Sequence, residues 1–126
     1  MTEAVRDEIE KINQEFTDRF ARGDHAGVAA LYTEDALFLP TDKPVARGRD
    51  QIRETFASYA EDGITDVRFE TLEVEERDEV VLELAHSHVF RGTEQVRKSL
   101  YVIVWRRDSD GVLRLHWDVV SSSRER

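Results

Sequence analysis

The sequence contains no cysteine, and this absence excludes several kinds of site. A chain without cysteine forms no disulfide, has no thiolate nucleophile and builds no cysteine-ligated zinc site. Long apolar runs are also missing, since the longest, residues 100–105, is far too short to cross a bilayer. The charged start of the chain lacks the apolar core of a signal peptide, so we expect a cytoplasmic protein.

Positive charge is scarce as well. The chain carries 18 Lys and Arg against 27 Asp and Glu, which gives a formal net charge of −9. Such a surface repels phosphate backbones and anionic lipid, so we expect neither nucleic acids nor membranes as partners. The six glycines are scattered at expected helix ends and turns, and none belongs to a phosphate-binding loop. We therefore expect no cofactor.

The remaining composition is that of one globular unit. Of the 126 residues, 40% are hydrophobic and 36% are charged, which is typical of a folded chain with a real core. This length suits one domain and leaves no room for a second. We therefore expect a single domain over residues 1–126.

Hydrophobic spacing predicts helices in the first half of the chain. A long first helix should end near Gly23, and a short second helix should be capped by Asp24. Residues 36–40 are predicted to form a short strand ended by proline. A third helix should be capped by Asp50 and end at Gly63.

After the third helix the hydrophobic pattern changes to period two, which indicates strands. Short turns join them, so an antiparallel meander is expected. Three helices followed by such a sheet form an α+β arrangement, in which the helices pack on one face of a curved sheet. The expected strands are residues 65–76, 79–91, 95–107 and 112–121.

The turns also predict the register of the strands. If Arg91 opposes Glu94 and Arg107 opposes Val112, alternation places three cross-strand rows on the face under the helices. A single β-bulge would mix the two faces. The three expected rows are Leu84, Tyr101 and Asp118; Leu82, Ile103 and His116; and His86, Ser99 and Val120.

The opposite face of the predicted sheet is as apolar as a core. A layer of three helices covers only one face, so we expect a second copy of the chain to cover the other. The side chains expected in this homodimer contact are Leu100, Val102, Val104, Leu115, Trp117 and Val119.

The face under the helices carries polar groups, which would be costly if they were packed dry. A pocket with apolar walls and a few polar groups at its base resolves this conflict. The lining expected for a small apolar ligand is Phe16, Phe20, Tyr32, Phe56, Tyr59, Leu84, His86, Ser99 and Ile103.

Asp118 is the leading candidate for chemistry. Desolvation on an apolar wall raises the pKa of a carboxyl group, which suits general acid–base work. Tyr101 would hold the carboxylate and His116 would share a proton with the ligand. A buried structural aspartate is the alternative. His86 and His88 form a pair that can bind a metal, but an intervening strand separates them from His116, so no metal site is expected.

Several motifs, in this order along the chain, resemble the nuclear transport factor 2-like superfamily. They occupy residues 22–24, 31–40, 48–52, Phe56, 104–111 and 117–118. The SnoaL-like or DUF4440 proteins are the most similar subgroup. The resemblance implies a cone-shaped α+β fold, with three N-terminal helices on a curved, mostly antiparallel sheet. It also implies a homodimer whose sheets pack together.

Ketosteroid isomerases share this layout, but the positions that match their oxyanion donors and base are Phe16, Ile103 and Leu39, all apolar. The resemblance therefore does not imply steroid-type isomerisation by their mechanism. It also matches Asp118 to an acidic residue of SnoaL-like polyketide cyclases. Two functions remain open. One is a cofactor-independent acid–base enzyme (an isomerase, cyclase, dehydratase or hydrolase) acting on a small apolar ligand, and the other is a non-catalytic ligand-binding or dimerisation module.

Overall fold

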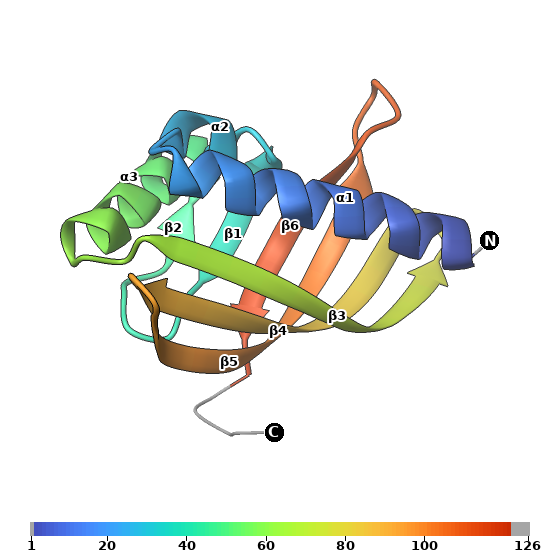
Figure 1. Ribbon diagram of the computed structural model, residues 1–126. Coiled ribbons are helices and arrows are strands. Elements are labelled where there is room, and N and C mark those ends of the chain that lie inside the picture. The colour runs from blue at the N-terminus through green and yellow to red at the C-terminus, as the bar shows by residue number, and fades with distance from the viewer. Residues whose placement is uncertain (1, 122–126) are drawn as a thin grey trace.

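The computed structural model describes residues 2–121, and the expected domain 1–126 extends past this range at both ends (Figure 1). Its elements confirm the predicted α+β order of helices followed by strands. The helices are α1 (Thr2–Ala21), α2 (His25–Ala29) and α3 (Gly48–Glu61). The strands are β1 (Tyr32–Leu39), β2 (Ala46–Arg47), β3 (Asp66–Arg77), β4 (Val80–Arg91), β5 (Glu94–Arg107) and β6 (Leu113–Val120).

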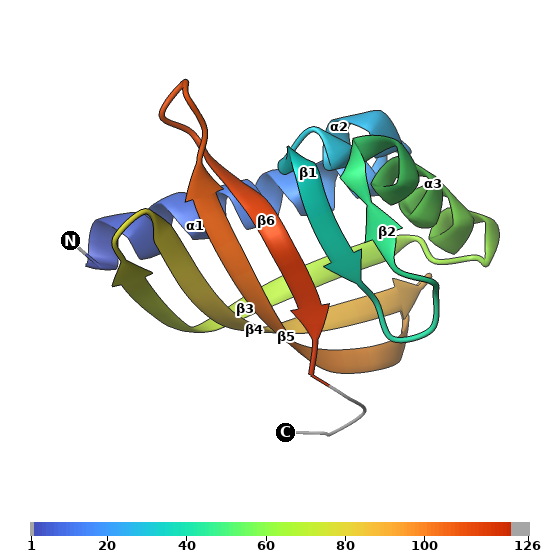
Figure 2. The ribbon, with the colours of Figure 1, turned by 180° about the vertical axis from the view of Figure 1, so that it is seen from behind.

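All six strands form one curved sheet in the order β2-β1-β6-β5-β4-β3. The predicted meander is confirmed, because β3 to β6 pair antiparallel with their neighbours in sequence. The helices lie on one side of the sheet, with α1 running across the strands (Figure 1). Figure 2 shows the other side, where no described helix covers β1, β6 and β5. Within the described residues, no helix is long and apolar enough to cross a membrane.

Local signals explain where two of the helices begin. The side chain of Asp24 accepts a hydrogen bond from the Gly27 amide at 2.9 Å, as predicted for the cap of α2. The prediction that Asp50 caps α3 is wrong, because α3 begins at Gly48 and Asp50 lies inside its first turn. Gly48 has a φ of +78°, a conformation that lets the chain turn from β2 into the helix.

The first strand is longer than predicted. It begins at Tyr32, because its early residues pair in parallel with β6, opposite Leu115. The two-residue strand β2 lies in a segment without a strand pattern and pairs with the end of β1. The pairing with β6 joins segments that are distant in sequence, so no turn signal announces it.

The register of β4 and β5 changes part of the way along the pair. Arg91 opposes Glu94, as predicted, but Val89 opposes Arg97. Val96 is therefore an extra residue in β5, which is a β-bulge. Beyond it, every residue of β4 faces a partner one position later than predicted.

This one-residue shift exchanges the faces of β4. The predictions that Leu84 and His86 face the helices are wrong, because both residues lie on the opposite face of the sheet, in register with Val102 and Leu100. Glu83 and Ala85 instead face the inner side, where they are buried.

The register of β5 and β6 differs from the prediction in two places. Arg107 opposes Leu113 rather than Val112. Farther along, His116 has no partner, because the residues on either side of it pair with consecutive residues of β5. His116 is thus the extra residue of a second β-bulge.

The two differences together explain which side chains of β6 face inward. Between the turn and the bulge at His116, Leu115 turns into the core and is only 3% exposed, so its predicted place on the outer face is wrong. After the bulge, the second shift restores the predicted alternation. Trp117 faces outward and Asp118 inward, but the neighbour of Asp118 on β5 is Ile103 rather than Tyr101.

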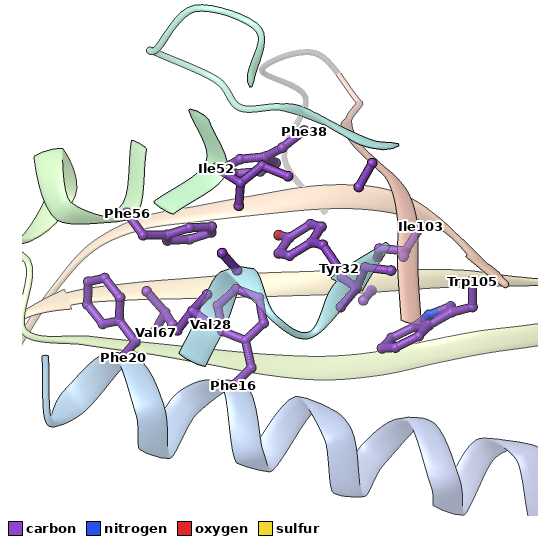
Figure 3. Packing of buried hydrophobic residues seen from close by; sticks show 14 of the residues in the cluster. Phe16, Phe20, Val28, Tyr32, Phe38, Ile52, Phe56, Val67, Ile103 and Trp105 are labelled. Atoms are coloured by element: carbon purple, nitrogen blue, oxygen red, sulfur yellow. The ribbon is translucent and has the colours of Figure 1, made fainter. Parts of the chain in front are cut away.

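An aromatic cluster fills the space between helices and sheet. Figure 3 shows Phe16 and Phe20 pointing from α1 toward the other helices and the sheet. The ring centroid of Phe56 lies 5.2 Å from that of Phe16 and 5.1 Å from that of Phe38, which stacks on it. Aromatic contacts of this kind add to the stabilisation from burial. The cluster fixes α3 against β1 and forms one wall of the site.

Candidate functional site

A cavity of about 60 Å³ lies between the helices and the inner face of the sheet. Most of its wall is apolar, and its polar residues come from α1, α3 and the strands β4, β5 and β6. The apolar lining is Phe16, Phe38, Phe56, Ile64, Val67, Phe69, Ala85, Val89, Ile103 and Leu115. The residues with polar side chains are Asn13, Tyr59, Glu83, His86, Ser87, Arg97, Ser99, Tyr101 and Asp118.

Most of the residues predicted for this site do line the cavity. They are Phe16, Phe56, Tyr59, Ser99, Tyr101, Ile103 and Asp118. His86 also belongs to the lining, but its side chain lies on the face of the sheet that points away from the helices, in register with Glu70 and Leu100. Four others lie outside its lining: Phe20, Tyr32, Leu84 and His116. Phe20 and Tyr32 are buried in the surrounding core, whereas the β-bulges turn Leu84 and His116 away.

Asp118 is the buried acid of the cavity. It is 8% exposed, and the Tyr32 hydroxyl donates a hydrogen bond of 2.7 Å to its Oδ2. Desolvation raises the pKa of Asp118 to about 7, against the lowering effect of the Tyr32 hydrogen bond. The charge of Glu83 adds to the increase. Tyr32 thus holds the carboxyl group, a role that the predicted register assigned to Tyr101.

Glu83 is a second buried acid, and sequence reasoning missed it. It lies in the same cross-strand row as Asp118, with Ile103 between them. Its carboxylate is 1% exposed and accepts from Thr71 Oγ1 at 2.7 Å and from Trp105 Nε1 at 2.9 Å. Burial raises the pKa of Glu83, while these hydrogen bonds and one from an asparagine of α1 oppose the increase. In the sequence, the feature that could have identified Glu83 is its position as the single charged residue in the otherwise apolar segment 80–85.

A polar contact closes part of the cavity wall. Asp42, in the loop after β1, accepts a hydrogen bond of 3.0 Å from the Tyr59 hydroxyl. Arg97 of β5 forms an ion pair of 3.0 Å with the same carboxylate oxygen. Although burial acts to raise the pKa of Asp42, the hydrogen bonds from Arg97 and Tyr59 hold it below its usual value. Because Tyr59 and Arg97 line the cavity, this contact borders the ligand space.

The structure places His116 on β6, between β1 and β5, and outside the lining of the cavity. Its Nδ1 lies 2.8 Å from the Thr33 hydroxyl, and its Nε2 lies 3.0 Å from a guanidinium nitrogen of Arg106. Burial and the charge of Arg106 lower its pKa. The predicted sharing of a proton between His116 and a ligand beside Asp118 is therefore wrong.

Among the described residues, one cluster has the composition of a metal site. Glu70, His86 and His88 bring one potential ligand atom each to within 4.8 Å of one another. Glu70, which comes from β3, does not line the cavity.

A family model described as a SnoaL-like domain matches residues 13–116 of the chain. Similar solved structures include a domain of unknown function with a cystatin-like fold from Nostoc punctiforme. It has 22% identity and a TM-score of 0.82, and the match covers 100% of this chain and 81% of that one. No curated protein matches the chain.

Two further solved structures show the same fold. A nuclear transport factor 2-like protein with a cystatin-like fold from Novosphingobium aromaticivorans has 23% identity and a TM-score of 0.77, covering 91% of this chain and 79% of that one. A protein from Catenulispora acidiphila, solved in complex with S-DNPA, has 19% identity and a TM-score of 0.78, covering 93% of this chain and 92% of that one.

Proposed function

The chain belongs to the SnoaL-like family of the nuclear transport factor 2-like superfamily, and we propose that it catalyses proton transfer to or from a small, mostly apolar ligand without a cofactor. The observation that supports this function is Asp118, a buried carboxyl group with a pKa of about 7 in the wall of an apolar cavity. Membership of the DUF4440 subgroup stays a prediction.

The pKa of Asp118 suits proton transfer in both directions. A group that titrates near the working pH is present as base and as acid, which is the optimum for general acid–base catalysis. The Tyr32 hydroxyl fixes the carboxyl group in one position. Isomerisation, cyclisation, dehydration and hydrolysis each include a proton transfer of this kind. Asp118 would take the proton from the ligand or deliver it.

The size of the cavity restricts the ligand. At about 60 Å³ it is smaller than the engineered cavity of about 150 Å³ that binds benzene. A molecule of the size of benzene or larger requires the cavity to widen. The complex of the Catenulispora acidiphila protein with S-DNPA supports ligand binding within this fold.

Proton exchange on small probes tests this function. A panel of small cyclic ketones, enones and epoxides would be followed by NMR in D₂O, with and without the protein. We expect at least one probe to exchange or react about 100-fold faster with the native chain than with Asp118→Asn. Asp110→Asn, which alters an exposed carboxylate paired with Arg114, is the matched control. Equal rates for the native chain and Asp118→Asn would contradict the proposal.

A non-catalytic binding protein is the second candidate. Two observations favour it: the small cavity, and the burial of Asp118 against a hydroxyl group that already occupies one of its oxygens. In that case Asp118 would serve to hold a ligand hydroxyl or amine. Probes that bind the native chain without any reaction would distinguish this function from catalysis.

We also propose that the outer face of the sheet is the contact surface of a homodimer. Val102 is 42% exposed and Trp117 is 49% exposed, a large share for side chains of this kind. Val104 and Val119, on the same face, are half-buried. Leu100, also predicted for this contact, is only 6% exposed and is therefore already buried within the chain. A second copy presenting the same face would remove Val102, Val104, Trp117 and Val119 from water.

A further inference from the structure

A carboxylate and two imidazoles meet on the face of the sheet that points away from the helices. Glu70 of β3 pairs directly with His86 of β4, and His88 follows two positions later on the same face. Oε1 of Glu70 lies 3.3 Å from Nδ1 of His86 and 3.3 Å from Nε2 of His88. Adjacent strands thus hold three side chains around one point.

These separations suit one metal ion. Zinc binds imidazole nitrogen and carboxylate oxygen at about 2.0–2.2 Å in tetrahedral geometry, which places neighbouring ligand atoms about 3.3 Å apart. All three candidate atoms lie within 4.8 Å of one another, so a small closing movement completes the arrangement. We propose that Glu70, His86 and His88 bind a divalent cation of the zinc type, with a water molecule in the remaining position.

The neighbouring contacts orient both imidazoles. The side-chain amide of Gln95 lies 2.8 Å from Nδ1 of His88, so it fixes the ring with Nε2 toward Glu70. An amide that turns over to present its oxygen would accept the Nδ1 proton of a metal-bound ring. His86 has 10% of its side chain exposed, and its Nε2 is buried with no hydrogen-bond partner. The nitrogen of His86 that would bind the metal ion is Nδ1, because it is the one that lies 3.3 Å from Oε1 of Glu70.

Charge and access set the expected affinity. The side chain of Glu70 is 57% exposed, so an ion reaches the cluster from solvent. Two cations oppose binding, since Arg68 and Lys98 flank His88 in the register, although Arg68 also pairs with a neighbouring aspartate. Three ligands beside two cations predict micromolar rather than nanomolar affinity.

Calorimetric titration of the untagged chain with zinc chloride at neutral pH tests the site. We expect one equivalent of zinc to bind, and His88→Gln and Glu70→Gln to weaken binding by about 100-fold or more. Gln95→Ala should weaken it by about 10-fold, as loss of an orienting partner does. Both His88 and Glu70 are far enough exposed for their variants to fold, whereas His86 is buried.

His116→Ala is the matched control, because it removes an imidazole outside the cluster. Native-like zinc binding by this variant supports the assignment. Failure of the native chain to bind zinc, or unchanged binding by His88→Gln, would overturn it. The proposed proton transfer at Asp118 is independent of this result, because the probe reactions are measured without added metal.

Discussion

Asp118 and Glu83 are two carboxyl groups buried in one cavity wall, and their surroundings assign them different roles. Glu83 accepts hydrogen bonds from three side chains, which satisfy its charged form. Asp118 accepts one described side-chain hydrogen bond, from Tyr32, and desolvation dominates its pKa. We therefore expect Glu83 to stabilise the fold and Asp118 to titrate near neutral pH.

The titration of Asp118 predicts a loss of stability as the pH rises. Its pKa is about 7 in the folded chain and about 4 when unfolded. Between these values the folded state holds the extra proton, so the free energy of unfolding falls with rising pH. At about 1.36 kcal/mol per pKa unit, the full loss is about 4 kcal/mol.

Urea denaturation of the native chain and of Asp118→Asn, at about pH 5 and about pH 8, measures this effect. We expect the variant to gain stability relative to the native chain at the higher pH. A difference between the two proteins that does not change with pH would contradict the raised pKa of Asp118.

The hydrogen bonds of Glu83 give a second prediction. Thr71→Val removes the 2.7 Å hydrogen bond to its buried carboxylate and should lower the free energy of unfolding by about 1–3 kcal/mol. Thr55→Val, which removes an exposed hydroxyl of α3, is the control and should change stability by less than about 0.5 kcal/mol. Equal losses in the two variants, measured by chemical denaturation, would show that Glu83 does not depend on Thr71.

Sequence reasoning found one of these acids and missed the other. Asp118 stood out beside the motif residue Trp117 near the end of the last strand. Glu83 was placed on the outer face by the predicted register, where a glutamate needs no explanation. Its role depends on donors from α1, β3 and β5, and no local pattern identifies them.

The starts of α2 and α3 give a prediction about helix capping. Sequence assigned equal capping roles to Asp24 and Asp50, but only Asp24 accepts a backbone hydrogen bond at the start of its helix. Asp24→Ala should cost about 1 kcal/mol of unfolding free energy. Asp50→Ala should cost about 0.3–1 kcal/mol, through the helix dipole alone. Thermal denaturation that ranks Asp50→Ala as the more damaging change would contradict this assignment.

The positions of β3 to β6 were predictable to within one or two residues, whereas the faces of β4 and β6 were not. Period-two patterns and turns mark where β3 to β6 begin and end. The faces of β4 depend on Val96, a single extra residue in β5 that leaves no signal in composition. The faces of β6 depend on a one-residue difference at the turn, where Arg107 opposes Leu113, and on the extra residue His116. The shift at Val96 moved Leu84 to the other face, and the difference at the turn moved Leu115. Asp118 kept its predicted face because two shifts cancel there.

For the whole molecule, the homodimer is the clearest expectation still to be tested. Trp117 is 49% exposed, more than any other side chain of the proposed contact surface, so Trp117→Arg should convert dimers to monomers. Burying one aromatic side chain of this size contributes about 1.5–3 kcal/mol per copy. Sedimentation velocity at micromolar concentration measures the change.

Val112→Arg is the control for that experiment, because Val112 is similarly exposed, at 42%, but lies in the turn before β6. We expect this variant to sediment like the native chain. A stable native monomer at micromolar concentration would refute the dimer and leave the outer face for another partner.

The proposed function requires the cavity to hold a carboxyl group able to take up and release a proton near neutral pH. Carbon-13 NMR titration of the Asp118 carboxyl, assigned by its absence from Asp118→Asn, measures this property directly. We expect a midpoint of about pH 7 in the folded chain. A midpoint near pH 4, the ordinary value of about 3.9 for an exposed aspartate, would contradict it.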